Sequence, residues 1–312
     1  MSEQPPKVAY ILGVYRSGTT LLSGLMGQLD GFFCVGELRA IWRELNLPTA
    51  RCGCGSPLID CDTWQRILEK AFGGVSEARL LAPRILRLQN EVFGRSRRWR
   101  RVPGLLRQRD MESAGDPLKR YAEALSNLYR AIAAVTGARV IVDSSKEPTD
   151  AALLRLVPDV ASFFVHIVRD PRGNVFSSRR ALSNPARRYE TARVGYSAMS
   201  WVAGNVAASA VRRADGVRSL LIRYEDLVER PRYTLELIAR SVDESVPVPH
   251  GEDGTIIMAP THTVCGNENR FRTGPVKVVE DTAWRDGLDP GHRLLVSLIC
   301  APFLRRYGYR PR

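Results

Sequence analysis

The sequence predicts an α/β fold in which helices cover both faces of a parallel sheet within a single domain. Three observations support this prediction. Short apolar runs recur along the chain, and segments with helical periodicity separate them. The first run, Lys7 to Val14, ends in a glycine-containing turn that precedes a helical pattern, which is typical of a buried parallel strand. Strands that alternate with helices favour a parallel sheet, and 312 residues with 44% hydrophobic composition suffice for one large core.

The predicted elements follow one another in regular order. Apolar runs predict strands at 7–14, 32–36, 139–142, 162–168 and 219–222. The first helix, 19–29, carries leucines and a methionine on one face and ends at Asp30-Gly31. Further helices are predicted at 149–157, 172–182, 190–213, 233–242 and 292–304.

Two stretches, 51–110 and 243–281, do not fit this alternation. The first is rich in Gly, Pro, Cys and Arg, and the second has no clear periodicity. Neither has enough apolar pattern for a core of its own, so we interpret both as insertions over the active face of one domain, 1–312.

The net charge of +13 indicates a surface that attracts anions, such as nucleic acid, acidic lipid headgroups, a polyanionic acceptor or a charged nucleotide. Arginines cluster between Arg95 and Arg101 around Trp99, a pattern that a solvated helix face explains better than nucleic-acid binding. We therefore expect no nucleic-acid partner, although contact with an anionic membrane surface stays open. The chain has no membrane-spanning run and no signal-peptide pattern at its start, which predicts a cytoplasmic protein.

The segment Gly13 to Thr20 lies where the first strand gives way to the first helix. Its G-x-x-x-x-G spacing is that of a P-loop, and such a loop aims backbone N–H groups at an anion. Thr19 stands where a nucleotide triphosphatase has lysine, and Arg16 lies inside the loop instead. This change disfavours a kinase and suits a terminal 5′-phosphate bound without metal. An ordinary tight turn is the alternative interpretation.

Two segments resemble the nucleotide-binding elements of sulfotransferases that use 3′-phosphoadenosine 5′-phosphosulfate (PAPS). The run 16–22 is similar to the 5′-phosphosulfate loop of that family, and 164–177 is similar to its 3′-phosphate segment. Arg169 at a strand's carboxyl end and Ser177 about two helical turns later can converge on one phosphate. The resemblance implies a P-loop-like fold and PAPS as co-substrate. It assigns the 5′-phosphate loop to Arg16, Ser17, Gly18, Thr19 and Thr20.

Further matches imply roles at the reacting centre. Lys146 ends a strand where the family has a basic residue, and Gly36-Glu37-Leu38-Arg39 is similar to its carboxylate-dependent branch, which includes protein-tyrosine sulfotransferases. The resemblance implies Glu37 as general base, Arg16 and Lys146 on the sulfuryl and bridging oxygens, and Arg39 as an acceptor contact. A late segment with Arg270, Arg272 and Gly274 resembles the family's element over the 3′-phosphate, although Thr273 replaces its lysine.

The chain has four histidines and six cysteines. His166 lies within a strand and is predicted to pack in the core, whereas His250 and His262 stay open as alternative bases. Cys52, Cys54 and Cys61 are close enough in sequence to bind zinc, but no fourth ligand is evident beyond Asp60 or Asp62. We expect free thiols or a small structural knot here, with a disulfide as an alternative, and we expect no metal.

The resemblance covers most of the chain and implies sulfuryl transfer from PAPS to an acceptor hydroxyl of a carbohydrate, glycolipid or small molecule. Segment 51–110 then becomes the cover of the acceptor site, and 243–281 the loop region over the nucleotide. Two alternatives stay open: a metal-dependent P-loop kinase and a non-catalytic module that binds polyanions or nucleic acid. Neither the acceptor nor the oligomeric state follows from the sequence.

Overall fold

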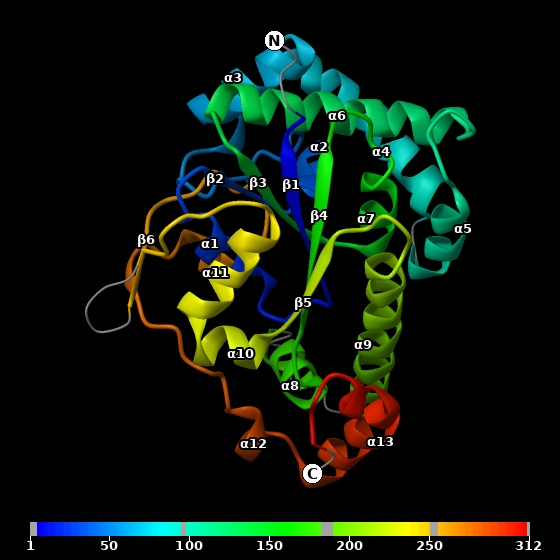
Figure 1. Cartoon of the computed structure of the whole chain (residues 1–312), viewed down its shortest axis with the longest axis vertical. Coiled ribbons are helices and arrows are strands. Elements are labelled where there is room, and N and C mark those ends of the chain that lie inside the picture. The colour runs from blue at the N-terminus through cyan, green and yellow to red at the C-terminus, as the bar shows by residue number, and fades with distance from the viewer. Residues whose placement is uncertain (1–4, 95–97, 182–189, 250–254, 311–312) are drawn as a thin grey trace.

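The computed structural model describes residues 5–94, 98–181, 190–249 and 255–310. Five strands form a parallel sheet in the order β2-β3-β1-β4-β5 (Figure 1). They are β1 (Lys7–Gly13), β2 (Phe32–Gly36), β3 (Val140–Lys146), β4 (Ala161–Val168) and β5 (Ser219–Arg223). All five were predicted, and β3 continues four residues beyond its predicted end, so that Lys146 closes the strand.

Helices cover both faces of the sheet, which confirms the predicted fold class (Figure 1). One face carries α1 (Thr19–Met26), α10 (Tyr224–Glu229) and α11 (Pro231–Ser241). The other carries α2 (Ile41–Glu44), α3 (Asp62–Phe72), α4 (Val75–Phe93), α6 (Asp116–Thr136), α7 (Pro148–Leu154) and α9 (Glu190–Arg212). The remaining helices are α5 (Val102–Arg107), α8 (Pro171–Ala181), α12 (Trp284–Gly287) and α13 (Pro290–Arg306), and a two-stranded antiparallel sheet joins β6 (Ile256–Met258) to β7 (Gly274–Val276).

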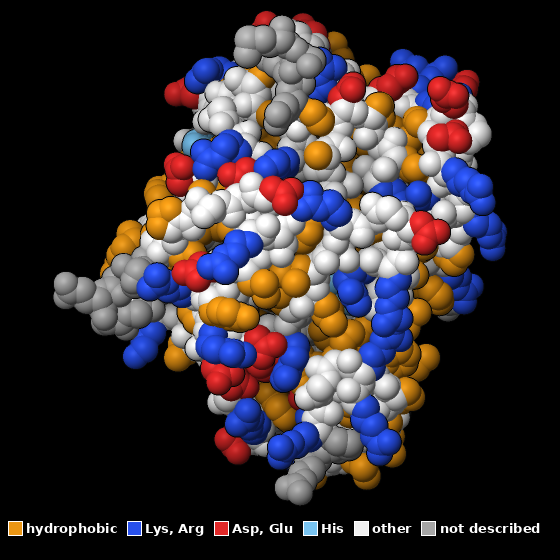
Figure 2. All heavy atoms as spheres, viewed as in Figure 1, with side chains coloured by type: hydrophobic (Ala, Val, Ile, Leu, Met, Phe, Trp, Pro, Cys, Tyr) orange, Lys and Arg blue, Asp and Glu red, His pale blue; other side chains and the backbone are white. Residues whose placement is uncertain are grey.

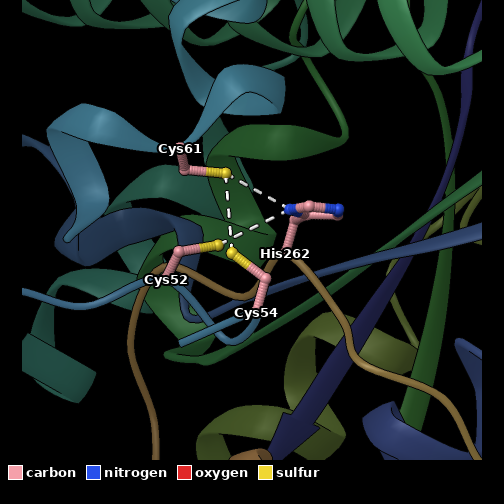
Figure 3. Close-up of side chains that lie close together, drawn as sticks. All are labelled: Cys52, Cys54, Cys61 and His262. Atoms are coloured by element: carbon pink, nitrogen blue, oxygen red, sulfur yellow. Dashed lines mark hydrogen bonds between the residues drawn. The ribbon is translucent and has the colours of Figure 1, made fainter. Parts of the chain in front are cut away.

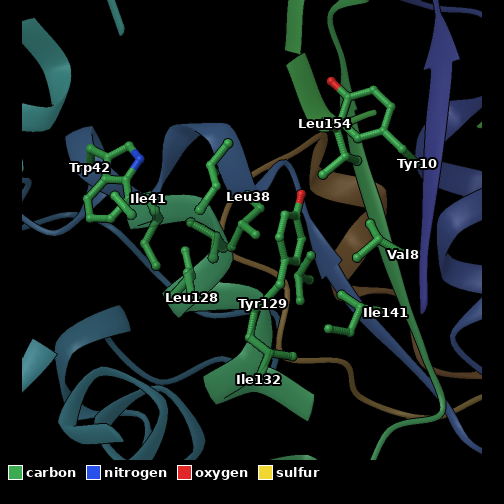
Figure 4. Close-up of a cluster of buried hydrophobic side chains, with 14 of the residues drawn as sticks. Val8, Tyr10, Leu38, Ile41, Trp42, Leu128, Tyr129, Ile132, Ile141 and Leu154 are labelled. Atoms are coloured by element: carbon green, nitrogen blue, oxygen red, sulfur yellow. The ribbon is translucent and has the colours of Figure 1, made fainter. Parts of the chain in front are cut away.

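The central strand β1 shows how the sequence divides the core into two. Val8, Tyr10 and Leu12 belong to the cluster beneath α6 and α7, whereas Ala9 and Ile11 belong to the cluster beneath α1 and α11. This follows from the alternation of side chains along a strand, and it requires an apolar residue at every position because both faces are covered. Figure 4 shows the first cluster, in which Tyr10 and Val8 of β1 lie near Leu154 and Ile141.

The interpretation of 51–110 as a cover over the active face needs correction. The segment contributes α3, α4 and α5, and Trp64, Ile67 and Phe93 are fully buried in the cluster beneath α6. Within the described residues, nothing from 51–110 lines the large cavity described below. Most of the segment is therefore an outer layer of the main core, and the predicted lid role lacks structural support.

Charged side chains of both signs are spread over the face seen in Figure 2, with Asp and Glu among the Lys and Arg. The net positive charge therefore does not gather in one patch on this face. Of the predicted arginine cluster, residues 95–97 lie outside the described part of the chain, and Arg100 stacks on Trp99 at 5.3 Å. No helix among the described residues has the length and apolar character needed to cross a membrane.

Candidate active site

A cavity of about 620 Å³ opens at the carboxyl ends of the parallel strands. This is where open α/β sheets bind ligands, because the loops that follow the strands converge there. Among the described residues, seven basic and two acidic side chains line it, which favours a ligand with several negative charges. The predicted site residues found in its wall are Arg16, Gly18, Thr19, Thr20, Glu37, Lys146, Arg169, Ser177, Arg270 and Arg272.

The loop between β1 and α1 supplies one wall of the cavity. Gly18 precedes α1 with φ 90°, and a Cβ at this position would lie 2.5 Å from the ring of Tyr224. Both the backbone angle and the lack of space therefore require glycine. Gly18 supplies no side-chain cap to α1, and the residues of the first turn of α1, whose backbone N–H groups lack an intrahelical acceptor, line the cavity. Ser17 is fully buried and accepts a hydrogen bond from Asn174 Nδ2 at 3.1 Å, so it holds the loop rather than a ligand.

Two non-glycine residues in the cavity wall, Arg16 and Lys146, have positive φ angles of 70°. The left-handed region costs an L-residue about 1–2 kcal/mol, and such strain gathers at functional sites. Lys146 is the last residue of β3, and Arg16 lies in the loop between β1 and α1, so both unusual backbones follow a strand that opens on the cavity. The strain is therefore a local sign of function that the sequence did not show.

Arg16, Arg169 and Ser177 form a cationic corner of the cavity. Arg16 Nε donates to Ser177 Oγ at 3.0 Å, and Arg169 Nη1 donates to the Arg16 carbonyl at 3.3 Å. Burial, and then the nearby charges of Arg169 and Arg180, lower the pKa of Arg16. A crowded cluster of cations is relieved by an anion, so this corner is suited to a phosphate group.

Asp281 supplies the only carboxylate that an ion pair places in this corner of the described structure. Its Oδ2 lies 3.3 Å from Arg169 Nη2, and its Oδ1 lies 3.7 Å from Arg180 Nη1. The carboxylate therefore stands where a ligand's anionic group would meet the same two arginines. Arg169 is further held over the Tyr224 ring at 4.5 Å, which fixes its direction.

Glu37 and Lys146 form a second, separate pair in the same cavity. Lys146 Nζ lies 2.5 Å from Glu37 Oε1, and the two side chains are 5% and 20% exposed. Lys146 also lies 5.1 Å from the Tyr15 ring centroid, and it donates to the Ser144 carbonyl at 3.3 Å. A carboxylate and an ammonium group thus share one site, partly shielded from water, in the same cavity as the loop before α1.

A sequence model of the sulfotransferase family matches residues 9–247. The chain belongs to the sulfotransferase family. Its structure is similar to the sulfotransferase domain from the curacin biosynthetic pathway, with 15% identity, 99% coverage of each chain and a TM-score of 0.54. It is also similar to the sulfotransferase domain of the Synechococcus PCC 7002 olefin synthase, with 18% identity, 97% and 96% coverage and a TM-score of 0.51. At these identities the structural likeness shows the fold alone, and no curated protein sequence matches the chain.

In this sulfotransferase, Arg39 does not lie where its predicted role requires. It forms an ion pair with Asp150 and stacks on Phe93 at 5.3 Å, on the side of the sheet covered by α4 and α6. It is absent from the wall of the large cavity. The turn after Glu37 directs the two side chains apart, so the geometry gives Arg39 a structural role instead of an acceptor contact.

The late segment of the sulfotransferase also differs from its predicted geometry. Arg270 donates to the carbonyls of Thr263 and Arg51, both at 2.8 Å, and a Cβ on Gly266 would contact both Arg270 and Glu37. Arg270 therefore lies beside the Glu37 end of the cavity, while Asp281 lies against Arg169. The prediction that Arg270 covers the 3′-phosphate has no support in this geometry. Gly274 begins β7 and does not line the cavity, whereas Arg272 does.

The predicted histidines of the sulfotransferase lie in different surroundings, and none of those that the structure describes lines the cavity. His166 is buried in β4, its ring contacts Asn205 Oδ1 at 3.0 Å, and burial lowers its pKa to about 4, so its prediction as a core residue is confirmed. His262 does not line the cavity and lies instead among the cysteines. His250 lies outside the described residues.

Sequence reasoning missed several residues that the sulfotransferase cavity contains. Arg180 and Lys277 add positive charge, Asp281 adds the competing carboxylate, and Tyr224 packs under both Gly18 and Arg169. Tyr224 thus supports the loop and Arg169, and it also forms part of the wall. Arg180 could have been found because it follows Ser177 by one helical turn on the same helix face.

Proposed function

We propose that this sulfotransferase moves the sulfuryl group of PAPS to an acceptor hydroxyl by in-line displacement, with Glu37 as the general base. The supporting observation is that one cavity holds the Glu37–Lys146 pair and the cationic corner of Arg16, Arg169 and Ser177. Family membership favours sulfuryl transfer over the kinase and the binding module. PAPS carries phosphate groups at two positions of its ribose, and the cationic corner together with the adjoining N-terminus of α1 would suit two anionic groups.

The residues fit the donor in a specific way. The N–H groups of the loop before α1, with Thr19 and Thr20, would hold the 5′-phosphate, since a helix N-terminus attracts an anion. Arg169 and Ser177 would hold the 3′-phosphate, and Asp281 would give up its place there. No metal-bound step is needed to neutralise charge, because the cavity wall is already strongly basic.

The transfer step then assigns one task to each end of the Glu37–Lys146 pair. Glu37 accepts the proton of the acceptor hydroxyl while the oxygen of that hydroxyl forms a bond to sulfur. The bond from sulfur to the bridging oxygen breaks, and its electron pair stays on the 5′-phosphate. Lys146 and Arg16 stabilise the negative charge that develops on the bridging and sulfuryl oxygens. The products are the sulfated acceptor and adenosine 3′,5′-bisphosphate.

The cavity wall includes apolar side chains as well as charge. Met258, Val278 and Val279 contribute to this wall, and the C-terminal segment supplies about half of the lining residues that the structure describes. An acceptor that offers a hydroxyl on a partly apolar body, such as a glycolipid or small molecule, fits this lining. A carbohydrate acceptor is the remaining candidate class.

The test uses PAPS labelled in its sulfuryl group with pools of carbohydrate, glycolipid and small-molecule acceptors. We expect label transfer by the wild-type protein, and a loss of about 10²–10⁴-fold in turnover for Glu37→Gln with little change in nucleotide binding. Glu268→Gln is the matched control, because Glu268 is exposed and does not line the cavity. Turnover of Glu37→Gln within a few-fold of wild type would remove Glu37 as the base. Failure to bind adenosine 3′,5′-bisphosphate would overturn the donor assignment itself.

A further inference from the structure

Three cysteines and one histidine converge at a place outside the cavity. Cys52 and Cys54 lie on a hairpin whose ends pair at Arg51 and Pro57, and Cys61 directly precedes α3. His262 comes from the C-terminal segment, 201 residues after Cys61. Figure 3 shows the three thiols and the imidazole ring pointing toward one another. Their ligand atoms all lie within 4.8 Å of one another.

The distances match the edges of a tetrahedral zinc site. Cys54 Sγ lies 3.8 Å from Cys61 Sγ, and His262 Nδ1 lies 3.6 Å from Cys52 Sγ and 3.3 Å from Cys61 Sγ. Zinc bonds of about 2.3 Å to sulfur and about 2.1 Å to nitrogen give tetrahedral edges of about 3.8 Å and about 3.6 Å. Three of the six distances among the four atoms therefore lie close to such edges, and the other three are within 4.8 Å.

A disulfide does not account for this arrangement. All six cysteines are free thiols, and a sulfur–sulfur bond of about 2.05 Å would bring two of them together while leaving the third thiol and the imidazole without a role. Thiols form only weak hydrogen bonds, so hydrogen bonding alone gives little reason to gather four such groups. Soft thiolate ligands together with imidazole select zinc among the common divalent metals.

The surroundings of His262 hold its ring in the direction that a metal ligand needs. Nδ1 faces the thiols, while Nε2 lies 3.4 Å from the Thr63 hydroxyl. Trp64 Nε1 donates to the His262 carbonyl at 2.8 Å, and the ring stacks on Phe33 with centroids 6.0 Å apart. A partner on the second ring nitrogen, which orients the first toward the metal, is the usual feature of a histidine ligand.

We infer that Cys52, Cys54, Cys61 and His262 bind one structural zinc ion. Four protein ligands fill a tetrahedral shell and leave no open position, which distinguishes a structural site from a catalytic one. The expectation of free thiols or a structural knot rested on the lack of a fourth ligand, and His262 supplies it. The metal site itself does not depend on the proposed function.

The ion would tie the cysteine hairpin to a wall of the cavity. Thr263 and Cys265 follow His262 and line the cavity, and the Cys265 carbonyl accepts from the Glu37 backbone N–H at 3.2 Å. Gly53 N–H donates to the Thr263 carbonyl at 2.9 Å, an approach so close that a Cβ on Gly53 would lie 2.3 Å from Thr263 Oγ1. Zinc therefore fixes the segment that packs against Glu37, and only this link to turnover rests on the proposed function.

The experiment measures metal in the whole chain, purified without a histidine tag from cells grown with zinc. We expect one zinc ion per chain by elemental mass spectrometry, and a cobalt-substituted protein with the visible absorption of a tetrahedral thiolate site. Cys61→Ser and His262→Ala should lose the metal, whereas Cys300→Ser, which changes a buried thiol in α13, should keep it. His262→Cys should restore binding with a shifted cobalt spectrum, which separates loss of a ligand from failure to fold.

Two results would overturn the inference. One is wild-type chain that binds neither zinc nor cobalt while all six cysteines react with an alkylating agent after unfolding. The other is metal-free chain with two cysteines protected until a reductant is added, which would mean a disulfide. If the inference holds, chelation should lower Tm by more than about 5 °C, and zinc should restore it. A chelated protein that still binds adenosine 3′,5′-bisphosphate but turns over more slowly would separate the metal's role from that of the donor site.

Discussion

Lys146 Nζ and Glu37 Oε1 lie 2.5 Å apart in a cavity otherwise dominated by positive charge. The lysine ends β3 and the glutamate follows β2, and these strands are neighbours in the sheet. The pair brings the proposed base and the cation for the leaving group within one hydrogen bond of each other. Donor binding would offer Lys146 a second anion and so free Glu37 to meet the acceptor.

Replacing Lys146 tests this division of tasks. We expect Lys146→Ala to lower kcat by about 10²–10³-fold, because a preorganised charge at the developing anion is lost. Its affinity for adenosine 3′,5′-bisphosphate should change far less. Single-turnover kinetics and calorimetry measure the two quantities, and Lys70→Ala on the exposed surface of α3 is the control. Equal losses in binding and turnover would instead make Lys146 a ground-state contact.

The assignment of Arg169 to the 3′-phosphate gives a prediction about nucleotides. Arg169→Ala should weaken binding of adenosine 3′,5′-bisphosphate by about 10–100-fold, the scale of a lost charge-assisted hydrogen bond. It should weaken binding of AMP much less, since AMP lacks the 3′ group. Calorimetry with both ligands makes the comparison, and exposed Arg213→Ala serves as the control. Equal losses for the two nucleotides would contradict the assignment.

Asp281 should weaken the binding of the donor nucleotide. Its carboxylate pairs with Arg169 at 3.3 Å, so a phosphate must displace it. We expect Asp281→Asn to bind adenosine 3′,5′-bisphosphate about 3–10-fold more tightly, consistent with about 1 kcal/mol for a partly exposed ion pair. Asp286→Asn, outside the cavity wall, is the matched variant. Weaker binding by Asp281→Asn would show that the carboxylate contributes to the donor site rather than competing for it.

Gly18 allows the effect of backbone strain to be separated from that of crowding. Gly18→Ala combines a φ of 90° with a Cβ 2.5 Å from Tyr224, whereas Gly216→Ala has a φ of 72° and open space. Gly216→Ala should reduce the free energy of unfolding by about 1 kcal/mol. Gly18→Ala should cost more and should also weaken nucleotide binding, because Tyr224 supports Arg169. Chemical denaturation and calorimetry measure both, and equal stability of the variants would rule out the crowding effect.

The lowered pKa of His166 predicts how the free energy of unfolding depends on pH. Burial lowers its pKa to about 4, so between that value and 6.5 the unfolded chain binds a proton that the folded chain does not. The contribution of neutral His166 to the free energy of unfolding is fully present above pH 6.5 and is lost as pH falls toward 4. The total loss is about 3 kcal/mol. His166→Gln can still donate to Asn205 but does not titrate. The stability difference between this variant and wild type, measured by urea unfolding, should shift in the variant's favour on acidification, and a constant difference would contradict the prediction.

The sequence alone was enough to predict the strands and the loop between β1 and α1, because both depend on neighbours along the chain. Each of the five strands is a continuous apolar run, as a strand buried on both faces requires. Glycines at the end of the first run and a helical pattern after it predicted the loop that lines the cavity. The helices in 51–110 were missed because arginines and Pro83 obscure their apolar stripe, whose residues are identified only by what they pack against.

Only the tertiary structure decided which distant side chains meet. In the folded chain Arg39 pairs with Asp150, and Arg270 lies at the Glu37 end of the cavity. His262 lies beside cysteines that come about 200 residues earlier in the chain. A strand and its turn determine where a chain emerges from the sheet, and this can be predicted from local pattern. The direction of a long side chain depends on the free energy of packing against segments that the local pattern does not identify, so the sequence could predict the loop before α1 but not the side chains that it meets.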